Sequence, residues 1–307
     1  MKALRFSSLL IILCSFALPP KEVKLEYIFK VGDLHNWSQT SKQTITQTVP
    51  GVGEMVITAA TDASMQMKVV ELTATGAKIE TTYSKVKMFM KMPAPMGDVA
   101  MDSDGDAENL QNKMMKSMTQ KPFYIFMNKQ GVIEKVEGTD KLYSGISELG
   151  LEAAAAEQAK QSLQQALSEQ SIKASIESSL IQYSAAKVKA GDTWKNSVGT
   201  ALNFPTQINN TWKFEKLEGS IATINSDGIV VTTDKEKVIT INGLKAKVNF
   251  NGHQMTKGTV DTKSGWPSEI QLVSEINGTM TLLAGGMLPS DTDVPMKILS
   301  EGTFTIK

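Results

Sequence analysis

Alternation of apolar and polar positions predicts β-strands in two separate stretches of the chain. In the first stretch, about 24–138, residues 44–49 and 79–92 alternate in this way. In the second, about 187–307, β-rich runs such as 238–241 are bounded by Asn, Asp and Gly turn residues. An alternating strand buries one face and leaves the other in water. Both stretches are therefore expected to form antiparallel sheet.

Residues 139–186, between the two β stretches, change to a helical period. Alanine and glutamine fill many of the positions between the apolar ones, which suits helices with a single packed stripe. We expect these helices to cover an apolar face of the sheet that would otherwise be open. The stripe falls into two groups separated by Ser168: Ala156, Ala159, Leu163 and Leu167, then Ile172, Ile176, Leu180 and Tyr183.

The two β stretches share turn and strand motifs in the same order, which is the pattern of an internal repeat. The alternative is that short strand–turn patterns are alike in any β protein. A repeat predicts an α+β fold, mostly antiparallel β, with two similar curved, half-barrel-like sheets and a helical segment between them. The division is then 1–17 as signal peptide, 18–138 and 187–307 as β-rich repeats, and 139–186 as helical insert. The matched motifs are 30–33 with 189–192, Trp37 with Trp194, 67–72 with 212–217, and 128–132 with 262–266.

The beginning of the chain has the features of a secretory signal peptide. Lys2 and Arg5 precede a short apolar stretch at 6–16, and the small residues Ser15 and Ala17 suit cleavage after Ala17. We therefore expect an exported protein, periplasmic or secreted. No apolar run in the mature chain is long enough to span a bilayer as a helix.

Cleavage would also remove the only cysteine, Cys14, and the only arginine, Arg5. Leu13 is too bulky for a residue that precedes an acylated cysteine, so lipoprotein anchoring at Cys14 is not expected. Loss of Lys2 and Arg5 takes the 32 basic residues to 30, against 32 acidic ones. That balance lacks the positive charge of a nucleic-acid binder. A mature chain without cysteine has no disulfide and no thiol nucleophile.

Groups suited to catalysis are scarce in the sequence. His35 and His253 are the only histidines, and no Gly-x-Ser-x-Gly motif is present. A zinc site built on two histidines at i and i+4 is excluded. The glycine-rich residues 50–53 lack the Lys-Ser/Thr of a phosphate-binding loop. We therefore predict a protein that is not an enzyme and that uses no cofactor.

Methionine is unusually frequent, with 12 of the 17 methionines between residues 55 and 127. Three interpretations stay open. The residues fill a core, line a groove that accepts varied apolar ligands, or bind Cu(I) through their thioethers. The candidate groove residues are Met88, Met90 and Met92, which share one strand face, and Met114 and Met118, which share one helix face.

Alternating carboxylates at residues 102–108 are typical of either a Ca²⁺ site or a solvated acidic turn. The EF-hand template fails, because Ala107 stands at the glycine position and Lys113 at the position of the bidentate glutamate. We favour an acidic turn that also caps the following helix. The acidic residues are Asp102, Asp104, Asp106 and Glu108.

Six short motifs form a specific set along the mature chain. They are residues 29–33 (Phe-Lys-Val-Gly-Asp), 102–104 (Asp-Ser-Asp), 126–128 (Phe-Met-Asn), 131–132 (Gly-Val), 136–138 (Val-Glu-Gly) and 188–194 (Val-Lys-Ala-Gly-Asp-Thr-Trp). Their order resembles the exported bacterial domain-of-unknown-function family numbered 6263. No catalytic residues are established for that family. A looser similarity, in architecture alone, is to periplasmic half-barrel lipoprotein carriers, whose curved sheet and helices enclose an apolar groove.

The function predicted from these features is that of an exported, non-enzymatic protein with an apolar ligand, a lipid or a hydrophobic peptide, in a methionine-lined groove. Two alternatives stay open. One is Cu(I) handling by the same methionines. The other is an envelope scaffold or interaction module that holds no small ligand.

Overall fold

The structure is a computed structural model that describes residues 22–200, 204–241, 243–285 and 288–307. The expected signal peptide, 1–17, lies outside the described residues. Thirteen strands form one antiparallel sheet. They are β1 (Leu34–Val49), β2 (Gly53–Leu72), β3 (Gly76–Lys91), β4 (Val99–Asp102), β5 (Pro122–Asn128), β6 (Ile133–Glu137), β7 (Thr193–Gly199), β8 (Thr206–Glu218), β9 (Ile221–Thr232), β10 (Ile239–Ile241), β11 (Leu244–Asp261), β12 (Pro267–Leu282) and β13 (Thr292–Ile306).

The sheet consists of two meanders that are joined edge to edge. Its order is β6-β5-β3-β2-β1-β13-β12-β11-β9-β8-β7, with β4 added beside β3 and β10 beside β11. β6 and β7 end this path, so the sheet is open. The predicted class, α+β and mostly antiparallel, is confirmed. The two predicted halves share one hydrogen-bonded sheet, because β1 pairs with β13. Each of these strands would otherwise be an edge strand with unpaired backbone N–H and C=O groups.

The turn that leads into each half has the same geometry, as the predicted repeat requires. Gly32 and Gly191 adopt φ values of 96° and 95°, a region that favours glycine. The Gly32 N–H donates to the Val69 carbonyl at 2.8 Å, and the Gly191 N–H donates to the Phe214 carbonyl at 2.7 Å. A register shift follows Val69 in the β2–β3 pair and Phe214 in the β8–β9 pair. These matches support the internal repeat.

One end of the curved sheet is closed by the segment before β1, residues 22–31, which we call the strap. The Tyr27 N–H donates to the Lys129 carbonyl at 2.8 Å, and the Ile28 N–H donates to the Ser264 carbonyl at 2.9 Å. These carbonyls belong to the β5–β6 and β11–β12 turns, so the strap bridges the two halves. The ring of Tyr27 packs on Tyr183 with centroids 5.0 Å apart. The closed end is therefore filled with protein.

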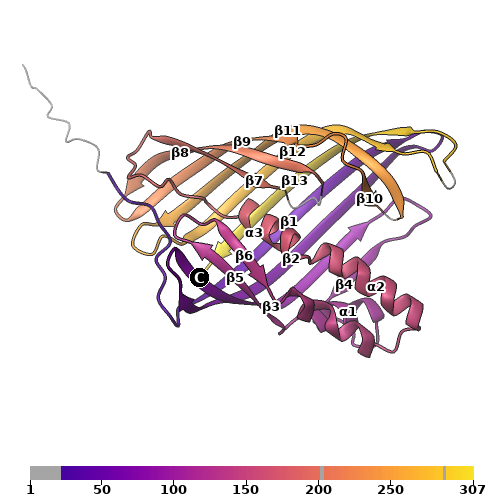
Figure 1. The fold of residues 1–307 in the computed structure, drawn as a ribbon, viewed down its shortest axis with the longest axis horizontal. Coiled ribbons are helices and arrows are strands. Elements are labelled where there is room, and N and C mark those ends of the chain that lie inside the picture. Colours follow the sequence, from indigo (N-terminus) through magenta and orange to yellow (C-terminus); the bar gives the residue numbers. More distant parts are fainter. Residues whose placement is uncertain (1–21, 201–203, 242, 286–287) are drawn as a thin grey trace, which may run out of the picture.

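The helical segment lies on the inner side of the curved sheet (Figure 1). All four residues of the apolar stripe predicted for its C-terminal part are buried: Ile172, Ile176, Leu180 and Tyr183. The predicted helical spacing is confirmed for Ile172 and Ile176 and is wrong for Leu180 and Tyr183, because the helix ends at Ser178. The stripe of α2 is only partly covered, and α2 has no buried residue. No described helix is long and apolar enough to cross a bilayer. The helices are α1 (Leu110–Met118), η1 (Thr139–Glu148), α2 (Ala153–Ala166) and α3 (Glu169–Ser178).

Candidate ligand-binding hollow

Strand registers show which side chains share the inner face, the face that carries the buried core. Residues directly opposite on neighbouring strands point to the same side of a sheet. Each cross-strand row can therefore be followed through the pairs. Two adjacent rows differ sharply in polarity. The first, which we call the polar belt, is Asn196, Asn210, Gln254, Ser274, Ser300 and Gln43. The second, which we call the isoleucine row, is Val198, Ile208, Val230, Ile276, Ile298, Ile45 and Ile57.

Two apolar clusters lie on either side of the polar belt. The larger one fills the closed end around the strap and includes the fully buried Trp37 and Phe214. The smaller one is built on the isoleucine row and Phe250, further toward the other end of the strands. A well-packed domain usually has one continuous core. The division of this core by a polar layer is therefore a distinctive feature of the inner face.

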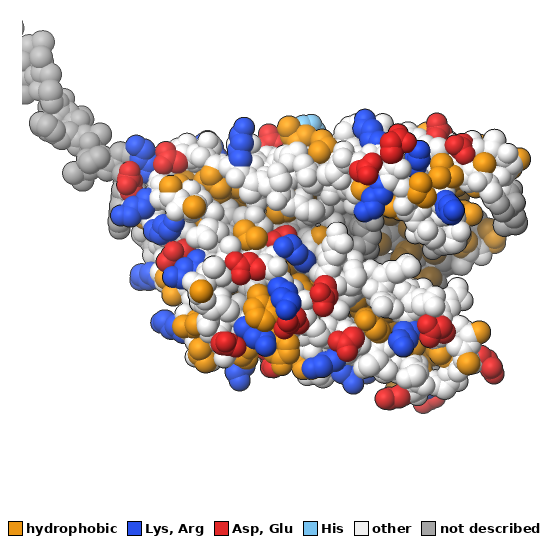
Figure 2. All heavy atoms as spheres, viewed as in Figure 1, with side chains coloured by type: hydrophobic (Ala, Val, Ile, Leu, Met, Phe, Trp, Pro, Cys, Tyr) orange, Lys and Arg blue, Asp and Glu red, His pale blue; other side chains and the backbone are white. Residues whose placement is uncertain are grey.

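The end opposite the strap is the mouth of the hollow. Inner-face residues there, including Ile45, Ile57, Met280 and Met296, are partly exposed, although Ile298 beside Ile45 and Val248 beside Met280 are buried. Figure 2 shows the molecule hollowed between its two halves at this end, with hydrophobic side chains inside. A cavity of about 940 Å³ lies between α2, α3 and the strand ends near Thr206. This volume falls in the range of small-molecule sites.

Met88 and Met90 lie on the inner face, as their alternation predicted. Met90 pairs with Ala59, which pairs with Gln43 of the polar belt, and Met88 pairs with Thr61 in the adjacent row; both methionines are partly exposed. Phe89, between them, points to the outer face and is exposed. Met92 lies just beyond the end of β3 and is partly exposed. The shared face is therefore observed for the two methionines inside the strand.

Sequence reasoning missed one methionine of this face. Met101, in β4, pairs directly with Met88 and so shares the inner face. The loop at 92–98 separates Met88 from Met101. Alternation within β3 shows the face of Met88 but not which residue of the next strand pairs with it. The inner face beside the β3 edge thus carries three thioethers, those of Met88, Met90 and Met101.

The methionines of α1 are placed differently. The helix packs on η1, β4 and β3, and its buried residues are Met115 and Met118. Met114 is partly exposed. Met115 was not among the predicted groove residues. The assignment of Met114 and Met118 to a ligand groove stays a prediction.

A smaller cavity of about 170 Å³ lies between the polar belt and α3. At the far edge of the belt, the Trp212 indole N–H donates to the Asn196 side-chain oxygen at 2.8 Å. The Asn196 amide donates in turn to the Gln182 side-chain oxygen. These bonds tie the belt to the chain that follows α3. The cavity is lined, among others, by Gln43, Gln254, Ser274, Ser300, Ser175 and Ser179.

The two histidines lie on opposite faces of the sheet. His35 stacks on Trp266 with ring centroids 4.0 Å apart, and burial lowers its pKa, which favours the neutral imidazole. His253 pairs with Ile229 and Glu275 on the outer face. In the described part of the chain, no three His, Cys, Asp or Glu side chains are grouped as metal ligands.

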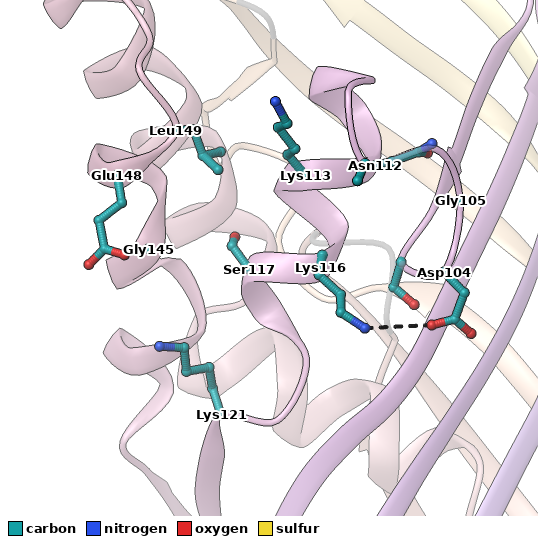
Figure 3. A pocket seen from close by; sticks show the side chains of 12 residues that line it. Asp104, Gly105, Asn112, Lys113, Lys116, Ser117, Lys121, Gly145, Glu148 and Leu149 are labelled. Carbon is teal, nitrogen blue, oxygen red and sulfur yellow. Dashed lines mark ion pairs between the residues drawn. The ribbon is translucent and has the colours of Figure 1, made fainter.

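The acidic residues 102–108 form a turn whose carboxylates are already engaged. The Asp104 N–H donates to Asp102 at 2.9 Å, which lowers the pKa of the Asp102 carboxyl. Asp104 pairs with Lys85 at 3.2 Å and with Lys116 at 3.7 Å, the latter drawn in Figure 3. The cap of α1 differs from the prediction. It is Asn109, whose side chain accepts from a helix N–H, and the first turn of α1 contains no acidic residue.

Comparison with known proteins places the chain in a family. Residues 74–267 match the model of a "Family of unknown function (DUF6263)". No curated protein matches the chain. Among solved structures, it is similar to lipovitellin, from a study of lipid–protein interactions in that protein, with a TM-score of 0.51 and 9% identity. That match covers 91% of this chain and 25% of the lipovitellin chain, so the protein spans about a quarter of it.

The outer membrane protein OprG from Pseudomonas aeruginosa matches over 91% of this chain and 97% of its own, with 6% identity and a TM-score of 0.28. A TM-score this low does not show a shared fold. The likeness to lipovitellin shows the fold alone. The family match covers more than half of the sequence, and the chain therefore belongs to the DUF6263 family of unknown function.

Proposed function

We propose that the protein binds an apolar small molecule of the lipid class in the hollow of its sheet and catalyses no reaction on it. One observation carries the proposal. Ile45, Ile57, Met280 and Met296 share the inner face with the buried core, yet they remain partly exposed at the mouth. Apolar surface of this kind gains free energy when a ligand covers it, roughly 0.8 kcal/mol for each buried CH₂ group.

The shape of the site supports the same proposal. The closed end is sealed by the strap, and the opposite end is open, so a chain-like ligand would enter from the mouth. Met88 and Met90 suit such a site, because methionine is flexible and adapts to varied apolar shapes. The lipovitellin fold, in a protein studied for its interactions with lipids, is compatible with this use.

The proposed setting is outside the cytoplasm, in the periplasm or beyond the cell. The signal-like residues 1–17 motivate this placement. A lipid crossing water needs a cover for its hydrocarbon, and an exported protein with an apolar hollow provides one.

Three neighbouring residues of β3 give a matched test. Met88→Gln with Met90→Gln places polar groups on the inner face, whereas Phe89→Gln changes only the exposed outer face between them. The mature protein would be examined by native mass spectrometry for bound lipid and titrated with a fluorescent fatty-acyl probe. We expect the double variant to lose at least fivefold in affinity and Phe89→Gln to bind as the unaltered protein does.

A bare mass together with no probe binding would overturn the proposal. Equal losses in the double variant and in Phe89→Gln would also count against it. Cu(I) binding is the second candidate, favoured by the three thioethers of Met88, Met90 and Met101 on one face. Replacement of all three by leucine keeps the surface apolar. It should therefore preserve lipid binding and abolish Cu(I) binding if the metal interpretation is right.

A further inference from the structure

The polar belt is a layer of uncharged hydrogen-bonding groups on the inner face of the hollow. On one side of it lies the isoleucine row, and on the other lies the core of the closed end. Its position is set by strand register rather than by a surface loop. Gln254 is 7% exposed, whereas its neighbour Met255, on the outer face, is 63% exposed. Within β11, the polar Gln254 side chain is therefore buried and the adjacent apolar Met255 side chain is exposed.

Several polar atoms of this region have no protein partner among the described residues. They are the side-chain oxygen of Asn210, the hydroxyl of Ser226 and the amide nitrogen of Gln182, on residues 5%, 6% and 4% exposed. A buried polar atom left without a hydrogen bond costs about 1–3 kcal/mol. Such atoms are normally satisfied by water or by a ligand. These three atoms show that the protein does not fully satisfy the polar groups of the belt and its surroundings, although none of the three residues lines the cavity beneath α3.

Gly228 occupies the belt position between Asn210 and Gln254 and is closely packed. A Cβ at Gly228 would lie 2.6 Å from the Asn210 side-chain oxygen and 3.2 Å from the Gln254 carbonyl oxygen. The Ile208 side chain would also lie only 2.7 Å from this Cβ. The glycine therefore leaves the space that the Asn210 side chain occupies in the belt.

The cavity beneath α3 fits a small polar group. Its volume is about 170 Å³, a few times the roughly 30 Å³ that a water molecule occupies in the liquid. On the helix side, the Ser178 and Ser179 hydroxyls donate to the Ser175 carbonyl at 3.0 and 2.9 Å, which leaves their oxygens as acceptors. On the sheet side, the Gln254 amide offers both a donor and acceptor sites.

Charged side chains are missing from the inner face around this cavity; Glu301, which also borders it, occupies an outer-face position of β13 and is exposed. The belt and the isoleucine row contain no Asp, Glu, Lys or His. The rows that flank them are also uncharged. An ion buried here would lack a partner, and an unpaired buried charge is very costly. The flanking rows are Met88, Thr61, Ser41, Gly302, Leu272, Thr256, Ser226 and Trp212 on one side, and Met55, Gln47, Met296, Gly278, Phe250, Thr232 and Thr206 on the other.

We infer that the ligand is an uncharged amphiphile. Its hydroxyl, ester or amide group docks against the polar belt under α3, and its hydrocarbon chain runs along the isoleucine row to the mouth. This inference rests on the proposed function, because it names the class of lipid that the hollow accepts. A fatty-acid carboxylate or a phospholipid headgroup would have to stay at the mouth, since nothing on the inner rows neutralises it.

The test compares three probes of equal chain length on the mature protein: monooleoylglycerol, oleate at pH 8 and 1-octadecene. Displacement of a bound fluorescent acyl dye reports each affinity. We expect monooleoylglycerol to bind most tightly. Gln254→Leu, and separately the milder Ser274→Ala, should weaken it about tenfold, the effect of one lost hydrogen bond, while octadecene binding is unchanged. Met255→Leu, on the outer face beside Gln254, is the control and should change neither.

The outcomes separate the inference from the proposed function. Equal binding of monooleoylglycerol and octadecene, unaffected by Ser274→Ala, would mean that the belt holds only water and would overturn the inference alone. Tighter binding of oleate than of monooleoylglycerol would overturn it as well. If none of the three probes displaces the dye or binds, the proposed function itself fails.

Discussion

Gly265 provides a sharp test of how the closed end is built. It lies in the β11–β12 turn with φ of 71°, buried against the strap. A Cβ at this position would lie 2.6 Å from the carbonyl carbon of Glu26 and closer still to its oxygen. Gly219, in the β8–β9 turn, has a similar φ of 64° and nothing within 4 Å of its Cβ position. The two glycines differ in surroundings and not in backbone conformation.

The expected destabilisation follows from that difference. Gly219→Ala should cost only the left-handed backbone strain of an L-residue, about 1–2 kcal/mol. Gly265→Ala carries the same strain and must also push the strap away. That movement would break the bond from Ile28 N–H to Ser264 and the 2.7 Å bond from the Tyr183 hydroxyl to Gly265. Each contributes about 1 kcal/mol, so we expect Gly265→Ala to lose about 3–4 kcal/mol.

Urea unfolding of the two variants, followed by tryptophan fluorescence, measures the comparison. Trp266 adjoins Gly265 and stacks on His35, so its emission reports directly on the closed end. The free energy of unfolding should fall by about 2 kcal/mol more for Gly265→Ala than for Gly219→Ala. Equal losses, within about 0.5 kcal/mol, would refute the claim that the strap is packed against this turn.

Two further predictions concern charged groups. Burial raises the pKa of the Glu177 carboxyl, despite its 2.8 Å bond from the Ile133 N–H and its pairing with Lys173. The native state then binds the proton more tightly than the unfolded state, so this group removes stability as pH rises from its ordinary value of 4.5 through the raised pKa. Glu177→Gln should flatten that part of the pH dependence, measured from urea midpoints between pH 4 and pH 7, and unchanged slopes would argue against it. Because Asp102 and Asp104 already pair with lysines, millimolar Ca²⁺ should leave the thermal midpoint unchanged, and a rise of several degrees would show that the turn binds the ion.

Local patterns predicted the start of α3 and the two equivalent turns because their causes are local. Ser168, which separates the two apolar groups in the sequence, is the N-cap of α3 and accepts a bond from a helix N–H. Gly32 and Gly191 mark equivalent turns because each needs a positive φ. The helical stripe before Ser168 was predicted to pack as well, yet α2 stays largely exposed. Periodicity shows which face is apolar but not whether a partner lies against it.

The polar belt could not be predicted from the pattern of any single strand. In β11 the sequence reads His253, Gln254, Met255 and Thr256, and a rule that buries the apolar residue would place Met255 inward. The structure buries Gln254 and Thr256 and exposes Met255. The face is fixed by the whole strand, whose Val248, Phe250 and Val260 share the parity of Gln254. The alternation over the whole of β11 therefore decides which face Gln254 and Met255 take, and the four residues 253–256 alone do not.

The belt also connects the internal repeat to the site. Gln43 belongs to the first half and Ser300 to the second, and the Gln43 amide donates to the Ser300 hydroxyl at 3.2 Å across the β1–β13 junction. A slip of one residue at this junction would turn Gln43 to the outer face and break the row. The pairing that joins the halves therefore also completes the belt. A layer of leucines here would be expected to stabilise the fold more than buried amides and hydroxyls with unmet bonds, and docking of a polar ligand group, as proposed above, would give the polar layer a role other than stability.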